Sequence, residues 1–224
     1  MIQETLKKVA AGQDLTYDEA YASMDEIFSG QVLGETTAGY LTALHMKGET
    51  LDEITASANG MRDHAESLPH DGIDVLEIVG TGGDCANSFN ISTTSGIVAA
   101  AAGVPIAKHG NRSVSSKSGA ADVLEALGVN ISISPEKMGK VLAECNMSFM
   151  FAQVYHKAMK YAGPVRKALG IPTVFNILGP LTNPAKAQMQ IMGVYKEELV
   201  DQMAPVLVLS LIHISEPTRR TPIS

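Results

Sequence analysis

The sequence has no tryptophan, only two cysteines, and aromatic residues at 5% of its 224 positions. Cys85 and Cys145 stand alone and far apart in the chain. That spacing fits neither a disulfide scaffold nor a zinc site built from pairs of cysteines. We therefore expect two free thiols in a reducing, cytoplasmic environment.

Long hydrophobic runs are also missing. The longest nearly apolar stretch, residues 96–107, contains Gly103 and Pro105 and falls short of the ~18 residues that a membrane span needs. Residues 1–28 mix charged and apolar side chains at helical spacing, without the continuous apolar segment of a secretory signal. We expect neither a membrane helix nor a signal peptide.

Positive charge is scarce, with 17 Lys and Arg against 24 Asp and Glu and a net charge of −7. This balance disfavours a polybasic surface that binds nucleic acid. Hydrophobic residues make up 45% of the chain, the composition of an ordinary globular protein, and the length is sufficient for a self-supporting core.

The last residues, 209–224 (LSLIHISEPTRRTPIS), depart from the helical pattern that runs to Val208. Residues 209–219 also resemble the in-frame translation of a sequencing adaptor, so we expect a non-native tail and leave it out of the fold prediction. A natural frayed C-terminus is the alternative. Without the tail, 15 basic and 23 acidic residues give a net charge of −8.

Residues 1–70 carry the signals of a small helical domain. Thr16 and Glu19, and again Thr50 and Glu53, have the spacing of a capping box at a helix start. Between them, residues 37–47 have apolar spacings of three and four, which predict a helix ended by a glycine. One face of that helix is expected to be buried: Tyr40, Leu41, Leu44 and a core histidine, His45.

From residue 71 to residue 208, strand-like and helix-like segments alternate. Strands are predicted over residues 75–79, 104–107, 147–151 and 188–195, and helices over 92–102, 116–127, 135–144 and 196–208. This alternation predicts an α/β domain with a mostly parallel sheet. Ligands of such sheets bind beyond the carboxyl ends of the strands, so the loops after Val79 and Ala107 are the candidate sites.

The first of these loops is GTGGD, residues 80–84. Cys85 stands where a dinucleotide-binding fingerprint needs glycine, and no P-loop sequence is present. Three glycines still allow close approach to a ligand, and the helix start at residues 90–93 is suited to a phosphate. A tight turn with a Ser/Thr cap is the alternative. Asp84 favours a ligand with a sugar hydroxyl or a metal, because a carboxylate repels an unshielded anion.

The second loop, KHGNRSVSS at residues 108–116, is followed by Lys117. Its cations, histidine, asparagine and hydroxyls are donors for a polyanion, and no acidic residue follows before Asp122. A solvated charged loop is the alternative. Two donor-rich loops at neighbouring strand ends predict a phosphorylated sugar that bridges them.

At these residues the chain resembles the anthranilate phosphoribosyltransferase family, which shares its fold with pyrimidine nucleoside phosphorylases. The resemblance rests on GTGGD (80–84), N-x-S-T (90–93), KHGNRSVSS (108–116), FMFAQVYHKAMK (149–160) and VRKALGIPTVFNILGPLTNP (165–184). It implies transfer of the phosphoribosyl group of phosphoribosyl pyrophosphate to anthranilate, with Mg²⁺ as cofactor. It also implies a homodimer that pairs through the helical domain.

The resemblance implies three sets of contacts. Phosphoribosyl pyrophosphate would meet Gly80, Gly83, Asp84, Ser88, Asn90, Ile91, Ser92, Thr93, Lys108, His109, Gly110, Asn111, Arg112, Ser113, Val114, Ser115, Ser116 and Ala120. Anthranilate would meet Gly80, Asn111 and Arg166, whose planar guanidinium matches a carboxylate. Ser92 would be a magnesium ligand, and His109 an orienting group and not an acid or base.

The chain departs from the family in one respect. The family places an Asp-Glu pair, which carries most of the magnesium coordination, beyond the helix that ends near Val208, and this sequence lacks it. We therefore expect an α/β domain that is incomplete at its C-terminus and inactive as printed. One alternative is a pyrimidine nucleoside phosphorylase. The other is a nucleic-acid-binding relative of the same fold, and the acidic net charge disfavours this second alternative.

Overall fold

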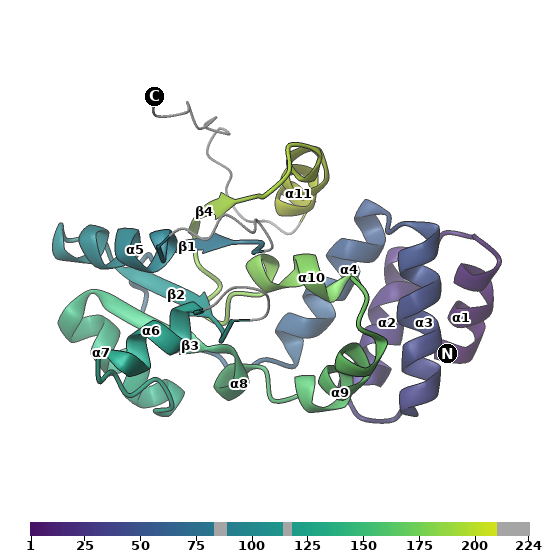
Figure 1. Ribbon diagram of the computed structural model, residues 1–224, viewed down its shortest axis with the longest axis horizontal. Coiled ribbons are helices and arrows are strands. Elements are labelled where there is room, and N and C mark those ends of the chain that lie inside the picture. Colours follow the sequence, from purple (N-terminus) through teal and green to yellow (C-terminus); the bar gives the residue numbers. More distant parts are fainter. Residues whose placement is uncertain (83–88, 114–117, 210–224) are drawn as a thin grey trace.

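The computed structural model describes residues 1–82, 89–113 and 118–209. Figure 1 shows a bundle of helices beside a parallel sheet that carries helices on its faces. The bundle begins with four helices: α1 (Ile2–Ala10), α2 (Tyr17–Phe28), α3 (Gly34–Lys47) and α4 (Leu51–Asp63). None of the described helices is long and apolar enough to cross a membrane.

Two of these helices begin at the predicted capping boxes. The Thr16 hydroxyl accepts a hydrogen bond from the Glu19 amide at 3.3 Å, and the Glu19 carboxylate accepts one from the Thr16 amide at 3.1 Å. Thr50 and Glu53 repeat the arrangement at 3.3 and 2.8 Å. Both helix starts are confirmed, because each box satisfies amides that have no partner inside the helix.

Helix α3 begins three residues before the predicted Thr37. Tyr40, Leu41 and Leu44 are buried as expected, but His45 is exposed, so its prediction as a core residue is wrong. His45 lies in the last turn of α3. The periodicity of a sequence identifies the inward face of a helix but not how far along that face the neighbouring helices extend.

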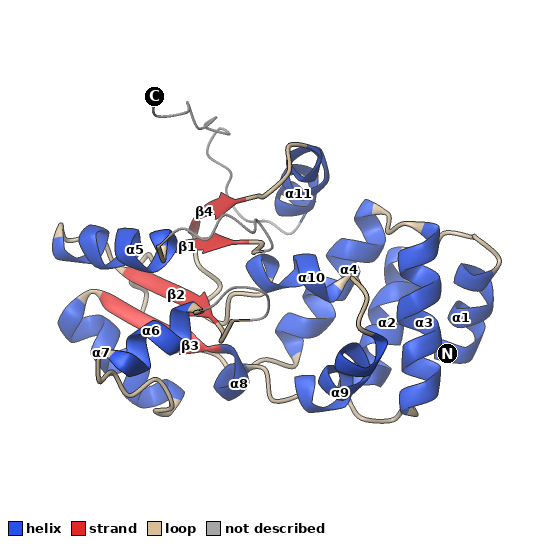
Figure 2. Ribbon diagram, in the orientation of Figure 1, coloured by secondary structure: helices blue, strands red, loops and turns tan. Residues whose placement is uncertain are grey.

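Within the described residues, the sheet has four parallel strands in the order β3-β2-β1-β4. Its strands are β1 (Leu76–Gly80), β2 (Ile106–Gly110), β3 (Met147–Phe151) and β4 (Met189–Gly193). Helix α5 (Ile91–Ala101) lies between β1 and β2, helices α6 (Ala120–Ala126) and α7 (Pro135–Cys145) lie between β2 and β3, and α11 (Glu198–Leu209) follows β4. Figure 2 shows this alternation, which confirms the predicted α/β fold.

Strand β2 lies further along the chain than predicted. Lys108, His109 and Gly110 belong to the strand and not to the loop after it. These polar residues can lie in a buried strand because the interior offers partners: the Lys108 ammonium donates to the Ile78 carbonyl at 2.8 Å. Helix α6 begins only at Ala120, later than the predicted residue 116.

No element was predicted between residues 152 and 187. The structure places three helices there, α8 (Ala152–Tyr155), α9 (Met159–Leu169) and α10 (Phe175–Leu178), followed by the 3-10 helix η1 (Gly179–Leu181). They are short or contain proline and glycine, which weakens any periodic signal. Helix α9 packs against α2 and α3, and α10 against α4.

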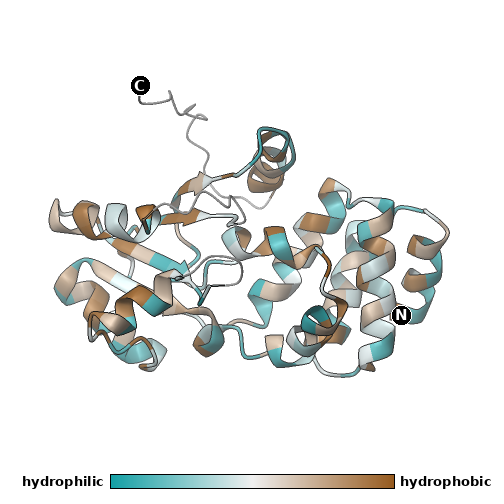
Figure 3. Ribbon diagram, viewed as in Figure 1, coloured by the Kyte–Doolittle hydropathy of each residue, from teal (hydrophilic) through white to brown (hydrophobic). Residues whose placement is uncertain are grey.

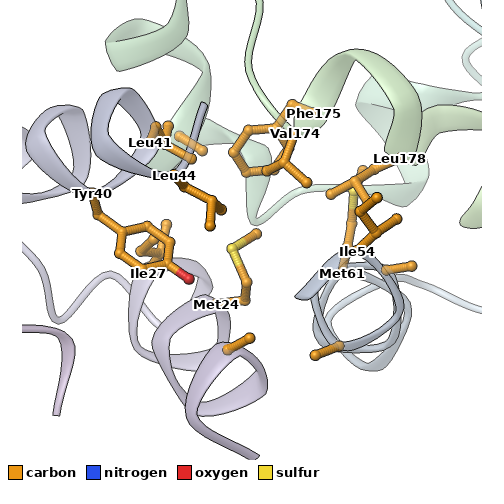
Figure 4. Close-up of a cluster of buried hydrophobic side chains, with 14 of the residues drawn as sticks. Met24, Ile27, Tyr40, Leu41, Leu44, Ile54, Met61, Val174, Phe175 and Leu178 are labelled. Atoms are coloured by element: carbon orange, nitrogen blue, oxygen red, sulfur yellow. The ribbon is translucent and has the colours of Figure 1, made fainter. Parts of the chain in front are cut away.

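One hydrophobic core joins the first four helices to later parts of the chain. Figure 4 shows Phe175 and Leu178 of α10 among the side chains of α2, α3 and α4. Met203 and Val206 of α11 complete the same cluster. Figure 3 shows hydrophobic residues in the segments that meet there. The helical bundle is therefore assembled from segments at both ends of the chain.

Two helix-interior glycines give a stability prediction. A methyl group on Gly139 of α7 would overlap the carbonyl oxygen of Pro69, whereas one on Gly39 of α3 would make only an ordinary contact with the Leu6 side chain at 3.6 Å. We expect Gly139→Ala to lower the free energy of unfolding by about 1–3 kcal/mol. Gly39→Ala should raise it by about 0.5–1 kcal/mol, because alanine loses less backbone entropy. Urea unfolding measures both, and equal effects of the two substitutions would contradict the overlap.

Candidate functional site

The four strands end at one edge of the sheet because all are parallel. Gly80 at the end of β1 pairs with Gly193 of β4, and Gly110 at the end of β2 pairs with Phe151 of β3. Strands β1 and β2 are neighbours. The two loops identified from the sequence therefore leave the sheet side by side, as the site prediction requires.

The described part of the first loop, residues 80–82, continues directly from the end of β1. The Thr81 amide donates to the Gly193 carbonyl at 3.0 Å, and Gly82 has a left-handed φ of 71°, which a side chain would disfavour. Gly83, Asp84 and Ser88 lie outside the described residues. Their predicted contacts stay predictions.

Helix α5 begins immediately after this loop. Its N-cap is Asn90, whose side chain makes no capping hydrogen bond, and its first three residues are Ile91, Ser92 and Thr93. No side-chain cap is present at Asn90, and the turn of the alternative, residues 83–88, lies outside the described residues. The Thr93 hydroxyl is buried without a hydrogen-bond partner among the described residues. The first amides of α5 remain suited to an anion.

A magnesium site does not follow from the described residues alone. Among them, no three His, Cys, Asp or Glu side chains lie close enough together to hold a metal ion. Ser92 contributes one neutral hydroxyl at the second position of α5, and magnesium sites ordinarily include carboxylates. The residues that the structure describes thus offer one of the implied ligands.

The second loop is anchored by acidic residues of α6. Arg112 forms ion pairs with Asp122 at 3.2 Å and with Glu125 at 2.5 Å. The other oxygen of Asp122 accepts hydrogen bonds from the amides of Ser113 at 3.0 Å and Gly119 at 2.8 Å. Asp122, the first acidic residue after the loop, therefore connects its two ends, a contact that the sequence analysis did not predict.

The structure describes only some of the other residues predicted at this loop. Asn111 is exposed and its side-chain oxygen accepts from the Arg112 amide at 2.8 Å. Ala120 is the first residue of α6. Val114, Ser115 and Ser116 lie outside the described residues.

Lys108 and His109 are both buried. Burial lowers the pKa of Lys108. Nδ1 of His109 lies 3.3 Å from the Gly179 carbonyl, which assigns its proton to Nδ1 because a carbonyl only accepts. Nε2 then carries a lone pair, and it has no hydrogen-bond partner among the described residues.

The ring of His109 packs on a second buried histidine that the site prediction did not include. The centroids of the His109 and His156 rings are 4.9 Å apart. Burial lowers the pKa of His109 to about 3 and that of His156 to about 4. Both rings are therefore neutral near pH 7. The only sequence signal for His156 was its place within the FMFAQVYHKAMK segment.

These histidines give a pH prediction. Below the ordinary histidine pKa of 6.5 the unfolded chain binds protons that the folded chain excludes, so stability falls as pH falls from about 6.5 toward 4. We expect His156→Gln to reduce this slope by up to about 1 kcal/mol per pH unit. Urea unfolding at several pH values measures it. A slope that His156→Gln leaves unchanged would contradict the neutral buried imidazole.

Glu77 of β1 is a further buried residue at the site that the sequence did not single out. Its side chain is completely buried. It accepts hydrogen bonds from Nε2 of Gln190 at 2.8 Å and from the His109 amide at 3.3 Å. Burial raises its pKa. A lone carboxylate within the apolar run 75–79 was the signal that could have identified it.

Arg166 lies on α9, on the bundle side of the site. Its guanidinium lies 5.0 Å from the centroid of the Phe175 ring, and burial lowers its pKa. No carboxylate of a described residue lies within ion-pair distance of it. A half-buried guanidinium without a carboxylate partner can bind an anionic ligand.

Comparisons with known proteins agree with this architecture. The profile of the glycosyl transferase family, a/b domain, matches residues 72–212, and that of the glycosyl transferase family, helical bundle domain, matches residues 3–65. Anthranilate phosphoribosyltransferase of Lachnoclostridium phytofermentans is 60% identical over 93% of the chain, and that of Methanobrevibacter smithii 63% identical over 92%. The chain spans about 62% of the length of both relatives.

Solved structures show the same similarity. Anthranilate phosphoribosyltransferase of Thermus thermophilus superimposes with a TM-score of 0.87 at 46% identity, over 92% of this chain and 63% of the other. The Saccharomyces cerevisiae enzyme in complex with PRPP and Mg gives a TM-score of 0.86 at 31% identity, over 93% and 62%. The chain therefore belongs to the glycosyl transferase family that combines this helical bundle domain with this a/b domain, and within the family it resembles anthranilate phosphoribosyltransferases.

Proposed function

We propose that this protein transfers the phosphoribosyl group of phosphoribosyl pyrophosphate to the amine of anthranilate, giving N-(5-phosphoribosyl)-anthranilate and pyrophosphate. This reaction is a step of tryptophan biosynthesis. The observation that carries the proposal is 60% identity to an anthranilate phosphoribosyltransferase over 93% of the chain. The adjacent loops at the ends of β1 and β2 support it, because they offer donors on two sides of one ligand.

The donor substrate would lie over the ends of β1 and β2. Backbone amides at Gly80, Gly82 and the start of α5 would bind its phosphates, since a helix N-terminus attracts anions. Asn111 and Ser113 would approach from the second loop. Fixed donors of this kind stabilise the charge that develops on a departing pyrophosphate.

The acceptor would lie between the end of β2 and the bundle. Arg166 would bind the anthranilate carboxylate through its two parallel N–H donors. Nε2 of His109 is buried in the structure, so the residues that cover it must move before the amine can reach its lone pair. The lone pair would then accept a hydrogen bond from the amine and orient it. A pKa of about 3 makes His109 a weak base. Orientation of an already nucleophilic amine, and not proton removal, is the contribution this histidine can make.

We also propose Mg²⁺ as the cofactor, because the yeast relative was solved in complex with PRPP and Mg. Ser92 is the ligand that the resemblance implies, and its position at the start of α5 is compatible with that role. Since the described residues do not complete a metal site, no step of the reaction is assigned to the ion here.

The proposal also covers the location, the oligomeric state and the domain boundaries of the protein. We propose a cytoplasmic homodimer that pairs through a helical domain of residues 1–70, with an α/β domain over residues 71–208. The likeness to the family is what supports the dimer. The exposed side chains of Leu33, the N-cap of α3, and of Met46 in its last turn lie at opposite ends of this helix and form no single apolar patch.

The decay of anthranilate fluorescence, with phosphoribosyl pyrophosphate and Mg²⁺ present, tests the activity. The assay uses the chain as printed and the same chain continued to the length of its relatives. Consumption of anthranilate by the longer protein, with release of pyrophosphate, is the expected result. Phosphorolysis of pyrimidine nucleosides, or binding of single-stranded DNA in its place, would replace the proposal with one of its two alternatives.

A further inference from the structure

Three segments meet at the buried carboxylate of Glu77. Its Oε2 accepts from Nε2 of Gln190 on β4 at 2.8 Å, and its Oε1 accepts from the His109 amide on β2 at 3.3 Å. Nε2 of Gln190 also donates to the Pro180 carbonyl at 2.6 Å. Glu77 and Gln190 are paired neighbours across the sheet. One carboxylate and one amide therefore connect β1, β2, β4 and the segment after α10.

The orientation of the Gln190 amide is fixed by these contacts. Its NH₂ group has two protons, and both are used, one on Glu77 and one on Pro180. Its Oε1 is buried without a hydrogen-bond partner among the described residues. A flipped amide would place an oxygen against two oxygen acceptors, so the flip is strongly disfavoured.

Gly179, the residue before Pro180, contacts the ring of His109. The Gly179 carbonyl accepts from Nδ1 of His109 at 3.3 Å. From the bundle side, Nε of Arg62 on α4 donates to the Leu181 carbonyl at 2.6 Å. The segment 179–181 is thus connected to the sheet and to the bundle by its successive carbonyls.

We propose that Glu77 and Gln190 are positioning residues that hold the Gly179 carbonyl against Nδ1 of His109. This contact keeps the His109 proton on Nδ1 and leaves Nε2 as an acceptor. Its consequence for anthranilate rests on the proposed function, but the positioning itself does not. Two apolar side chains would fill the same space without the desolvation cost of a buried carboxylate. A fixed hydrogen-bond geometry is what this polar pair adds.

The test observes the His109 ring directly, by NMR of the chain labelled with ¹⁵N-histidine. His109→Gln identifies the signal of this ring. In the unsubstituted chain we expect one neutral tautomer, protonated on Nδ1, from pH 8 to pH 5. Gln190→Met and Glu77→Gln should each convert it to a mixture of the two tautomers. The connection from Glu77 through Gln190 to the Pro180 carbonyl is then disturbed, and the Gly179 carbonyl is held only by the Thr182 amide and hydroxyl, each at 3.3 Å.

Gly139→Ala is the matched control, because it should also destabilise the α/β part but lies outside this network. It should leave the His109 tautomer unchanged. The proposal is overturned if Gln190→Met keeps the single Nδ1 tautomer, or if Gly139→Ala changes the tautomer as much as Gln190→Met does. Should Glu77→Gln fail to fold, Gln190→Met decides alone.

A binding measurement tests whether the His109 tautomer matters for function. Anthranilate is fluorescent, so its own fluorescence reports how tightly it binds. We expect Gln190→Met to weaken binding about tenfold, the effect of roughly one lost hydrogen bond. If Gln190→Met shows a mixture of tautomers but binds anthranilate as tightly as the unsubstituted protein, the His109 tautomer does not control anthranilate binding. An unsubstituted protein of full length that binds no anthranilate contradicts the proposed function, whereas the NMR result uses no ligand.

Discussion

Replacement of Glu53 by glutamine is expected to lower the free energy of unfolding by about 3 kcal/mol or more. Glu53 is completely buried at the start of α4, and its Oε2 lies 2.9 Å from the Lys47 ammonium. The Lys47 side chain is itself only 5% exposed. Without the Glu53 carboxylate, the buried Lys47 ammonium keeps only the exposed Asp14 as a carboxylate partner, at 2.7 Å, so its burial is less well compensated.

The carboxylate of Glu53 also connects three parts of the bundle. Its Oε1 accepts from the Leu15 amide before α2 at 2.9 Å, and its Oε2 accepts from the Thr50 amide at 2.8 Å. Lys47 in turn donates to Asp14 at 2.7 Å. A glutamine amide places two N–H donors where one of these amides or the ammonium requires an acceptor. The loss is therefore larger than that of the ion pair alone.

Urea unfolding at pH 7 measures this effect. Glu66→Gln is the matched control, because its partner Lys157 is 64% exposed and the pair should contribute less than about 1 kcal/mol. The double variant Lys47→Met with Glu53→Gln should lose less than the sum of the single losses. A loss for Glu53→Gln as small as that for Glu66→Gln would show that the buried pair is not stabilising.

This ion pair shows which part of the fold the sequence could predict. The capping box of Thr50 and Glu53 is a local pattern, and it identified the start of α4 correctly. The contacts of Glu53 with Lys47 and Leu15 are tertiary, and no spacing along the chain indicates them. The strands and most helices were likewise predicted from local alternation, with boundaries displaced where polar residues such as Lys108 are buried in a strand.

The site shows the same division. The sequence identified both loops and placed them at neighbouring strand ends, because the carboxyl ends of parallel strands share one edge. Glu77, His156 and Gln190 were missed, since each acts through partners far away in sequence. Glu77 and Gln190, for example, are 113 positions apart. Arg112 was predicted as a free donor, but two carboxylates of α6 pair with it.

Arg166→Ala is expected to lower kcat/KM for anthranilate roughly 100-fold in the protein of full length, mainly through a higher KM. The guanidinium is half-buried over Phe175 and has no carboxylate partner among the described residues. A bidentate pair with the anthranilate carboxylate would thus be its main polar contact. Charge-assisted hydrogen bonds contribute about 1.5–3 kcal/mol each, so the loss of two corresponds to an effect of roughly 100-fold at the lower limit.

Three comparisons test whether the loss of kcat/KM comes from the planar pair of N–H donors of Arg166. Arg166→Lys keeps the charge but loses the planar pair of donors, so it should recover only part of the affinity. Lys167→Ala removes the exposed neighbouring cation of α9 and should leave both KM values unchanged. Steady-state kinetics with each substrate varied in turn measures them. If Arg166→Ala raises KM for phosphoribosyl pyrophosphate and leaves KM for anthranilate unchanged, Arg166 does not belong to the acceptor site.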